Sequence, residues 1–98
     1  MAQTYGVPVE EIERGIKSGV RKVNIDTDCR MAITGQFRKT AKEKGAEFDP
    51  RKFLIPAMDE MERLCLDRFQ RFDTAGDASK IKVINIDEMA RRYDGGLL

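Results

Sequence analysis

Histidine is absent from this 98-residue sequence, and so is tryptophan. The lack of histidine removes the side chain that most often serves as a general base, a metal ligand or a pH switch near neutrality. A dominant charge is lacking too, since 18 basic and 17 acidic residues leave a net charge of +1. Basic residues are diluted by neighbouring acids and only 7% of residues are aromatic, so no nucleic-acid surface is expected.

Long apolar runs are also missing. No run approaches the roughly 18 residues of a membrane span, and the first residues lack the apolar core of a signal peptide. These absences predict a cytoplasmic protein that does not contact a membrane. At roughly 150 residues per domain, the length allows one small domain at most.

The two cysteines, Cys29 and Cys65, lie far apart in the sequence and lack the CxxC spacing of many metal and redox motifs. Each falls on the apolar stripe of a predicted helix. We interpret them as buried, reduced thiols rather than as metal ligands or nucleophiles.

Helical periodicity recurs four times along the chain. The predicted helices carry start or stop signals, with proline in a first turn and glycine after a last turn. Residues 85–88 (NIDE) have the pattern of a capping box. The predicted helices are a first one from Pro8 to near Gly19 and three more over residues 28–44, 50–72 and 86–93.

The helix predicted over residues 50–72 carries the longest apolar seam. Because this seam needs a surface to pack on, we expect it to pack on the other helices of the chain; the alternative is a free-standing helical binding or assembly module. The seam residues are Leu54, Met58, Met61, Cys65, Phe69 and Phe72, spaced 4-3-4-4-3.

Between the first two helices, residues 21–26 alternate apolar and polar side chains, which predicts a short strand. Residues 81–84 are a weaker second candidate. A lone strand cannot satisfy its backbone hydrogen bonds, so its partners must come from another copy of the chain or from another part of a longer one. A strand that leads directly into a helix is typical of a parallel sheet or barrel.

Polar side chains crowd the end of this predicted strand. Asn24 and Asp26 share one face and suit a substrate hydroxyl or carbonyl, while the Thr27 hydroxyl and the first N–H groups of the next helix suit a phosphate. The structural alternative is that Thr27 or Asp28 caps the helix and Asn24 faces water. Arg51 lies at a helix N-terminus, where a cation does not stabilise the helix, so its charge is a candidate for another use.

Four stretches carry a family resemblance: residues 5–12 (YGVPVEEI), 19–28 (GVRKVNIDTD), 48–54 (FDPRKFL) and 78–83 (ASKIKV). In this order they resemble the C-terminal portion of class II fructose-bisphosphate aldolase. The resemblance implies an α/β parent with a (β/α)8 TIM barrel, and residues 1–98 as a single C-terminal segment whose last barrel strand is 21–26. Alone, the chain is expected to be mostly α-helical with one or two short strands.

The resemblance implies a lyase of glycolysis or the Calvin cycle. It cleaves fructose 1,6-bisphosphate reversibly to dihydroxyacetone phosphate and glyceraldehyde 3-phosphate, with a zinc ion as the electrophile. The segment Asn24, Ile25, Asp26 and Thr27 resembles the motif that binds dihydroxyacetone phosphate. Arg51 resembles an arginine that reaches into a neighbouring subunit to hold the far phosphate, which implies a homo-oligomer.

The family's zinc ligands and proton-transferring acids lie upstream of the segment that this chain resembles. No catalytic and no metal-binding residue is therefore expected among these 98 residues. The chain is expected to be inactive without the zinc-bearing remainder. The alternative is a non-catalytic helical binding or assembly module derived from the aldolase.

Overall fold

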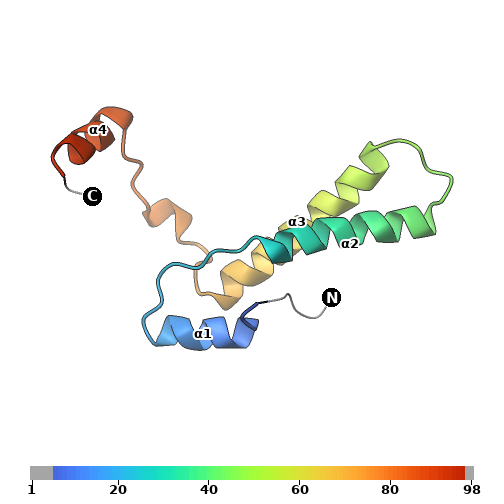
Figure 1. The fold of residues 1–98 in the computed structure, drawn as a ribbon, viewed down its shortest axis with the longest axis horizontal. Coiled ribbons are helices and arrows are strands. Elements are labelled where there is room, and N and C mark those ends of the chain that lie inside the picture. Colours follow the sequence, from blue (N-terminus) through green and yellow to red (C-terminus); the bar gives the residue numbers. More distant parts are fainter. Residues whose placement is uncertain (1–5, 97–98) are drawn as a thin grey trace.

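A computed structural model describes residues 6–96, so Tyr5 of the first family-like stretch lies outside the described residues. The chain is helical and elongated, with extents of 59 × 34 × 24 Å (Figure 1). The three later helices each begin and end within one residue of their predicted ranges. The elements are α1 (Val9–Lys17), α2 (Thr27–Glu43), α3 (Arg51–Arg71), a 3-10 turn η1 (Ala78–Lys80) and α4 (Ile86–Asp94).

Local signals account for several helix ends. Pro8 occupies the N-cap of α1, and two glutamates follow it in the first turn, where negative charge is favourable. Gly19 follows the helix with φ 114°, a conformation that glycine adopts without strain. The side-chain oxygen of Asn85 accepts the backbone N–H of Glu88 at 2.8 Å, which is one of the two bonds of the predicted capping box.

The main packing unit is an antiparallel hairpin of α2 and α3 (Figure 1). Near the connecting loop, the rings of Phe37 and Phe53 stack with centroids 6.3 Å apart. Thr40 and Ala57 are buried at the same end, with 4% and 2% of their surfaces exposed. Phe72, just after α3, is buried at the opposite end.

The predicted strands do not form. Within residues 6–96 the structure has no strand, and both 21–26 and 81–84 are irregular, so the expectation of one or two short strands is wrong for this chain. The physical reason is the absence of a pairing partner, because a strand is stable only when a neighbour takes its backbone hydrogen bonds. No backbone N–H of residues 21–26 donates to a backbone carbonyl among the described residues.

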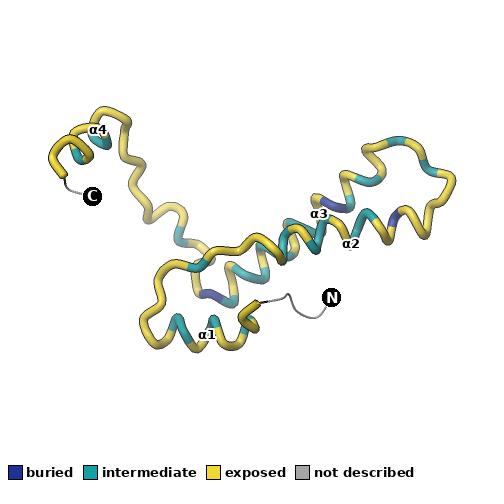
Figure 2. Tube along the Cα trace, in the orientation of Figure 1, coloured by how far each residue is buried: buried dark blue, intermediate teal, exposed yellow. Residues whose placement is uncertain are grey.

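The α3 seam packs only in part on the chain's own helices. Phe72 is 9% exposed and Met61 and Cys65 are half-buried, but Leu54, Met58 and Phe69 are 47%, 67% and 53% exposed. One shorter helix, α2, covers one side of the 21-residue α3, and the other side stays open (Figure 2). The expected packing of the seam on neighbouring helices is therefore incomplete.

The whole chain exposes more surface than a compact protein of its size. Its Cα radius of gyration is 18.6 Å, whereas about 13 Å is typical of a compact 100-residue domain. Its accessible surface of 8404 Å² exceeds the value for a compact monomer of its mass by about 2,700 Å². Residues after α3 add to this surface, since α4 stands apart from the hairpin and Val83 is 96% exposed (Figure 1). Large apolar side chains such as Phe48, Ile81 and Val83 are among the exposed residues, which is characteristic of a chain that packs on further protein.

Candidate functional site

Four of the five predicted site residues line one cavity. Asn24, Ile25, Asp26 and Thr27 form the connection into α2 and border a hollow of about 530 Å³. The opposite wall comes from residues 6 and 7 and from α1, including Gly15. The cavity therefore brings an amide, a carboxylate and a hydroxyl together at the N-terminus of a helix.

The start of α2 is not capped in the way that the structural alternative expected. Asp26, rather than Thr27 or Asp28, occupies the N-cap, and its side chain makes no capping hydrogen bond. The carboxylate of Asp26 instead accepts Nε of Arg30 at 2.9 Å, on the surface. Asn24 is exposed, as that alternative expected. The helix N-terminus is thus not blocked by the N-cap side chain, which suits an anion.

An ion pair fixes the first turn of α2 against α3. Asp28 Oδ2 and Arg68 Nη2 lie 3.0 Å apart, and both side chains are only 16% exposed. Arg68 also pairs with Asp67, while its Nε is buried without a hydrogen-bond partner in the described structure. Sequence reasoning missed Arg68, although a signal existed: it lies on the apolar seam, three residues after Cys65 and four before Phe72.

A second ion-pair cluster joins α1 to the C-terminal end of α3. Nε of Arg71 lies 2.9 Å from Glu13 Oε1, and its Nη2 lies 3.1 Å from Glu10 Oε1. The hydrogen bond from Arg71 lowers the pKa of Glu13. A backbone hydrogen bond, followed by the bond from Arg71, lowers the pKa of Glu10. These bonds hold α1 beside the segment that carries the candidate site.

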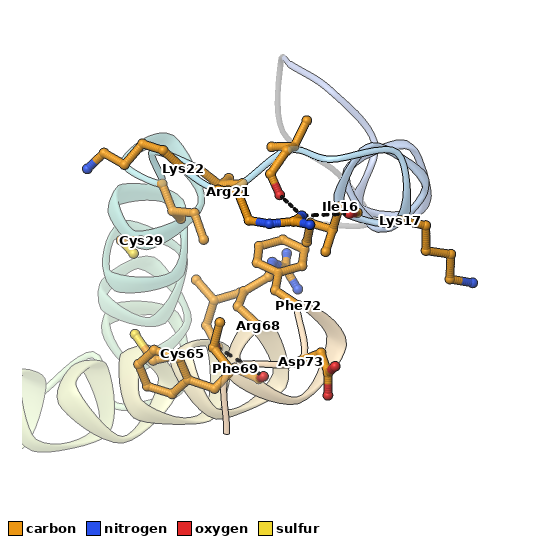
Figure 3. A pocket seen from close by; sticks show the side chains of 15 residues that line it. Ile16, Lys17, Arg21, Lys22, Cys29, Cys65, Arg68, Phe69, Phe72 and Asp73 are labelled. Carbon is orange, nitrogen blue, oxygen red and sulfur yellow. Dashed lines mark hydrogen bonds between the residues drawn. The ribbon is translucent and has the colours of Figure 1, made fainter. Parts of the chain in front are cut away.

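A larger cavity of about 910 Å³ adjoins the smaller one and is lined by residues of α1, the connection 20–25, α2 and the end of α3 (Figure 3). Its walls are mainly apolar, with basic side chains that include Lys17 and Arg21. Arg21 donates to the carbonyl oxygens of Ile16 and Val20 at 3.1 and 3.0 Å, so its guanidinium is held by the backbone at the end of α1. Five residues border both cavities: Val20, Lys22, Val23, Ile25 and Phe72.

Arg51, the fifth predicted site residue, lies at the other end of the hairpin. Because α2 has 17 residues, a helical rise of 1.5 Å per residue puts Arg51 about 25 Å from Thr27. Its side chain is 80% exposed and pairs with Asp49, with Nη2 and Oδ2 2.8 Å apart. The hydrogen bonds from Arg51 lower the pKa of Asp49. The structure therefore does not bring Arg51 together with the other four residues.

The residues present do not fit a zinc site. Among residues 6–96, no three cysteine, aspartate or glutamate side chains gather closely enough to hold a metal ion, and the sequence has no histidine. Zinc prefers four ligands from cysteine, histidine or carboxylate groups, so this part of the chain does not supply the ligand set.

Among residues 6–96, no helix has the length and apolar character needed to span a membrane.

Comparisons with known proteins cover nearly the whole sequence. A family profile described as "Fructose-bisphosphate aldolase class-II" matches residues 4–77. The chain is 74% identical over all 98 residues to "Fructose-bisphosphate aldolase 1" of Cereibacter sphaeroides, of which it covers 27%. It is 69% identical to "Fructose-bisphosphate aldolase 2" of Rhodobacter capsulatus, of which it covers 86%, and 57% identical over 96 residues to "Fructose-bisphosphate aldolase" of Nostoc commune, of which it covers 27%. The chain thus spans about a quarter of the length of two of these relatives.

Proposed function

The chain belongs to the class II fructose-bisphosphate aldolase family, and we propose that residues 1–98 act as one C-terminal segment of such an aldolase. The proposed reaction of the whole enzyme is the reversible cleavage of fructose 1,6-bisphosphate to dihydroxyacetone phosphate and glyceraldehyde 3-phosphate, in the cytoplasm. The observation that carries this proposal is that all 98 residues align with a fructose-bisphosphate aldolase at 74% identity while covering 27% of it.

In this proposal, the smaller cavity is the chain's share of the phosphosugar site. The amide of Asn24 and the carboxylate of Asp26 bind a hydroxyl or carbonyl of dihydroxyacetone phosphate, and Ile25 holds them two residues apart on one face. The Thr27 hydroxyl and the N-terminus of α2 hold the phosphate. The carboxylate of Asp26 would repel a phosphate, so it must serve the sugar end of the substrate.

We further propose that residues 21–26 form the last strand of a TIM barrel when the remainder of the enzyme is present. The segment is irregular between α1 and α2, and among residues 6–96 none of its backbone N–H groups donates to a backbone carbonyl. Active sites of such barrels lie at the carboxyl ends of the strands, where Asn24 to Thr27 would then stand. The excess surface of about 2,700 Å² is the kind of area that the rest of a barrel would cover.

The zinc ligands must come from outside residues 6–96, because the described residues offer no suitable cluster. The family resemblance places the proton-transferring acids upstream of this segment as well. The proposed segment therefore contributes substrate contacts and not the metal centre. By itself it is expected to show no aldolase activity.

We also propose that Arg51 serves the site of a neighbouring subunit in a homo-oligomer. The separation of about 25 Å from Thr27 is too large for both residues to contact one molecule of fructose 1,6-bisphosphate within one chain. The guanidinium is exposed and binds the Asp49 carboxylate through two bonds, Nε to Oδ1 at 3.1 Å and Nη2 to Oδ2 at 2.8 Å, a geometry that also suits a phosphate.

A chimera tests the proposal. The 98 residues replace their counterpart in the C. sphaeroides aldolase 1, and cleavage of fructose 1,6-bisphosphate is measured in the chimera and in the isolated chain. We expect an active chimera, an inactive isolated chain, and a loss of kcat/KM of at least about tenfold in Thr27→Ala or Asp26→Ala, the value of one lost hydrogen bond to a charged group. Thr34→Ala, on the exposed side of α2, is the matched control.

An oligomeric, folded chimera without activity would refute the proposal. So would equal kcat/KM for Thr27→Ala and Thr34→Ala. If the isolated chain also formed a defined oligomer that melts cooperatively, the open apolar side of α3 would instead mark a helical assembly module.

A further inference from the structure

The two cysteines come together in the fold although 35 residues separate them in the sequence. Cys29 lies in the first turn of α2 and Cys65 in the second half of α3, and both are free thiols. Figure 3 shows the two sulfur atoms pointing toward each other across the gap between these helices. Both residues are half-buried and line the cavity of about 910 Å³, which gives a small reagent a route to them.

Neighbouring contacts hold this pair in place. Asp28 precedes Cys29 and Arg68 lies one helical turn after Cys65, so their ion pair of 3.0 Å bridges the same two turns. This pair is largely shielded from water, with 16% of each side chain exposed, and it keeps the first turn of α2 against α3. The proximity of the two thiols is thus a property of the packed hairpin.

We propose that Cys29 and Cys65 form a thiol modification site that a low-molecular-weight disulfide converts to an intrachain disulfide. In the first exchange, one cysteine thiolate attacks the reagent and forms a mixed disulfide, and one small thiol leaves. In the second, the other cysteine attacks the protein sulfur of that mixed disulfide and releases a second small thiol. The two cysteines lose two electrons and two protons in total, and the reagent is reduced to two thiols.

Proximity drives this reaction more than thiol acidity does. Burial, together with the adjacent Cys65 thiol, raises the pKa of Cys29, so few Cys29 side chains are thiolates at neutral pH. The second exchange is intramolecular, and held reactants gain a large effective concentration over free ones. The product would tie the start of α2, and with it Thr27, covalently to α3.

The test treats the full 98-residue chain with oxidised glutathione, quenches it with N-ethylmaleimide and measures the intact mass and the tryptic peptides. The folded chain is expected to lose the mass of two hydrogen atoms and to give one linked peptide pair containing Cys29 and Cys65. Cys29→Ser and Cys65→Ser are expected to retain glutathione or to form intermolecular dimers instead. In denaturant, we expect intrachain closure to slow by at least about tenfold, because the fold no longer holds the thiols together.

Three results would overturn the proposal. These are a folded chain that accumulates a stable glutathione adduct, one that yields only disulfide-linked dimers or no product, and one that closes no faster than the denatured chain. The comparison of folded and denatured wild-type chain does not depend on how either variant folds. Circular dichroism under the reaction conditions verifies that the two samples differ in helix content.

Discussion

The ion pair of Asp28 and Arg68 should contribute much more to stability than a second pair of the same residue types only two residues away. Asp26 and Arg30 are 2.9 Å apart and Asp28 and Arg68 are 3.0 Å apart, so the two pairs match in chemistry and distance. They differ in solvent exposure, which is 70% and 77% for the first pair and 16% for both members of the second. Water therefore screens the attraction between Asp26 and Arg30 and weakens that between Asp28 and Arg68 much less.

The difference can be given a magnitude. Removing one partner of a fully buried pair costs about 3–5 kcal/mol, and the residual exposure of Asp28 and Arg68 reduces this to an expected coupling of about 2 kcal/mol. The exposed pair on α2 should couple by about 0.3–0.5 kcal/mol. For a chain of this size, about 1 kcal/mol corresponds to a shift in melting temperature of about 4–8 °C.

Two double-mutant cycles measure these couplings. One combines Asp28→Asn with Arg68→Met, and the other combines Asp26→Asn with Arg30→Met. Thermal unfolding followed by circular dichroism gives the free energy of unfolding of each variant. The energy of the contacts that Arg68 makes with Asp67 cancels in the coupling calculated from the cycle. Equal couplings in the two cycles would refute the argument that burial makes the difference.

Three further outcomes follow from burial and charge. Phe72→Ala should cost about 3 kcal/mol in the free energy of unfolding and Phe48→Ala almost nothing, because these rings are 9% and 92% exposed. Glu13→Gln should lower the melting temperature at neutral pH and not in acid, because the hydrogen bond from Arg71 lowers the folded-state pKa of Glu13. The stabilisation by this bond is present above the usual pKa of 4.5 and is lost as the pH falls through the lowered value. In the active chimera, Arg51→Ala should raise KM for fructose 1,6-bisphosphate at least about tenfold. Arg51→Lys should raise KM less, because lysine keeps the positive charge but only a guanidinium binds phosphate with two parallel bonds. Unchanged kinetics in both variants would show that Arg51 is not part of the site.

The helices could be predicted from the sequence because their signals are local. Pro8, the Asn85 cap and the apolar spacing of α3 each act within a few residues, and the structure has helices at all of these places. The strand over 21–26 could not be settled in this way, because alternation describes a side-chain pattern whereas a strand also requires a neighbour. The sequence has the pattern, and the described residues do not supply the neighbour.

The same difference between local and long-range information applies to the candidate site. Residues 24–27 lie together in the structure because they are consecutive, so spacing alone was sufficient to group them. The distance to Arg51 depends on the direction in which α3 folds back on α2, which no local pattern reveals. Arg68 was missed for a related reason, because its structural role depends on an ion pair with Asp28, forty residues away in the sequence.

The two halves of the candidate site should therefore differ in how firmly the chain itself holds them. Thr27 begins α2, whose first turn is fixed to α3 through Asp28 and Arg68. Asn24 belongs to the segment 21–26, whose backbone N–H groups donate to no backbone carbonyl among residues 6–96. In the isolated chain, the amide hydrogens of residues 21–26 should exchange with solvent at the rate of an unstructured peptide, while those beyond the first turn of α2 are protected. In the active chimera, strand pairing should slow exchange over 21–26 by at least about a hundredfold, since each amide would then open only with the sheet. Protection of 21–26 in the isolated chain would show that the segment orders itself, and the absence of protection in the chimera would show that it is not a barrel strand.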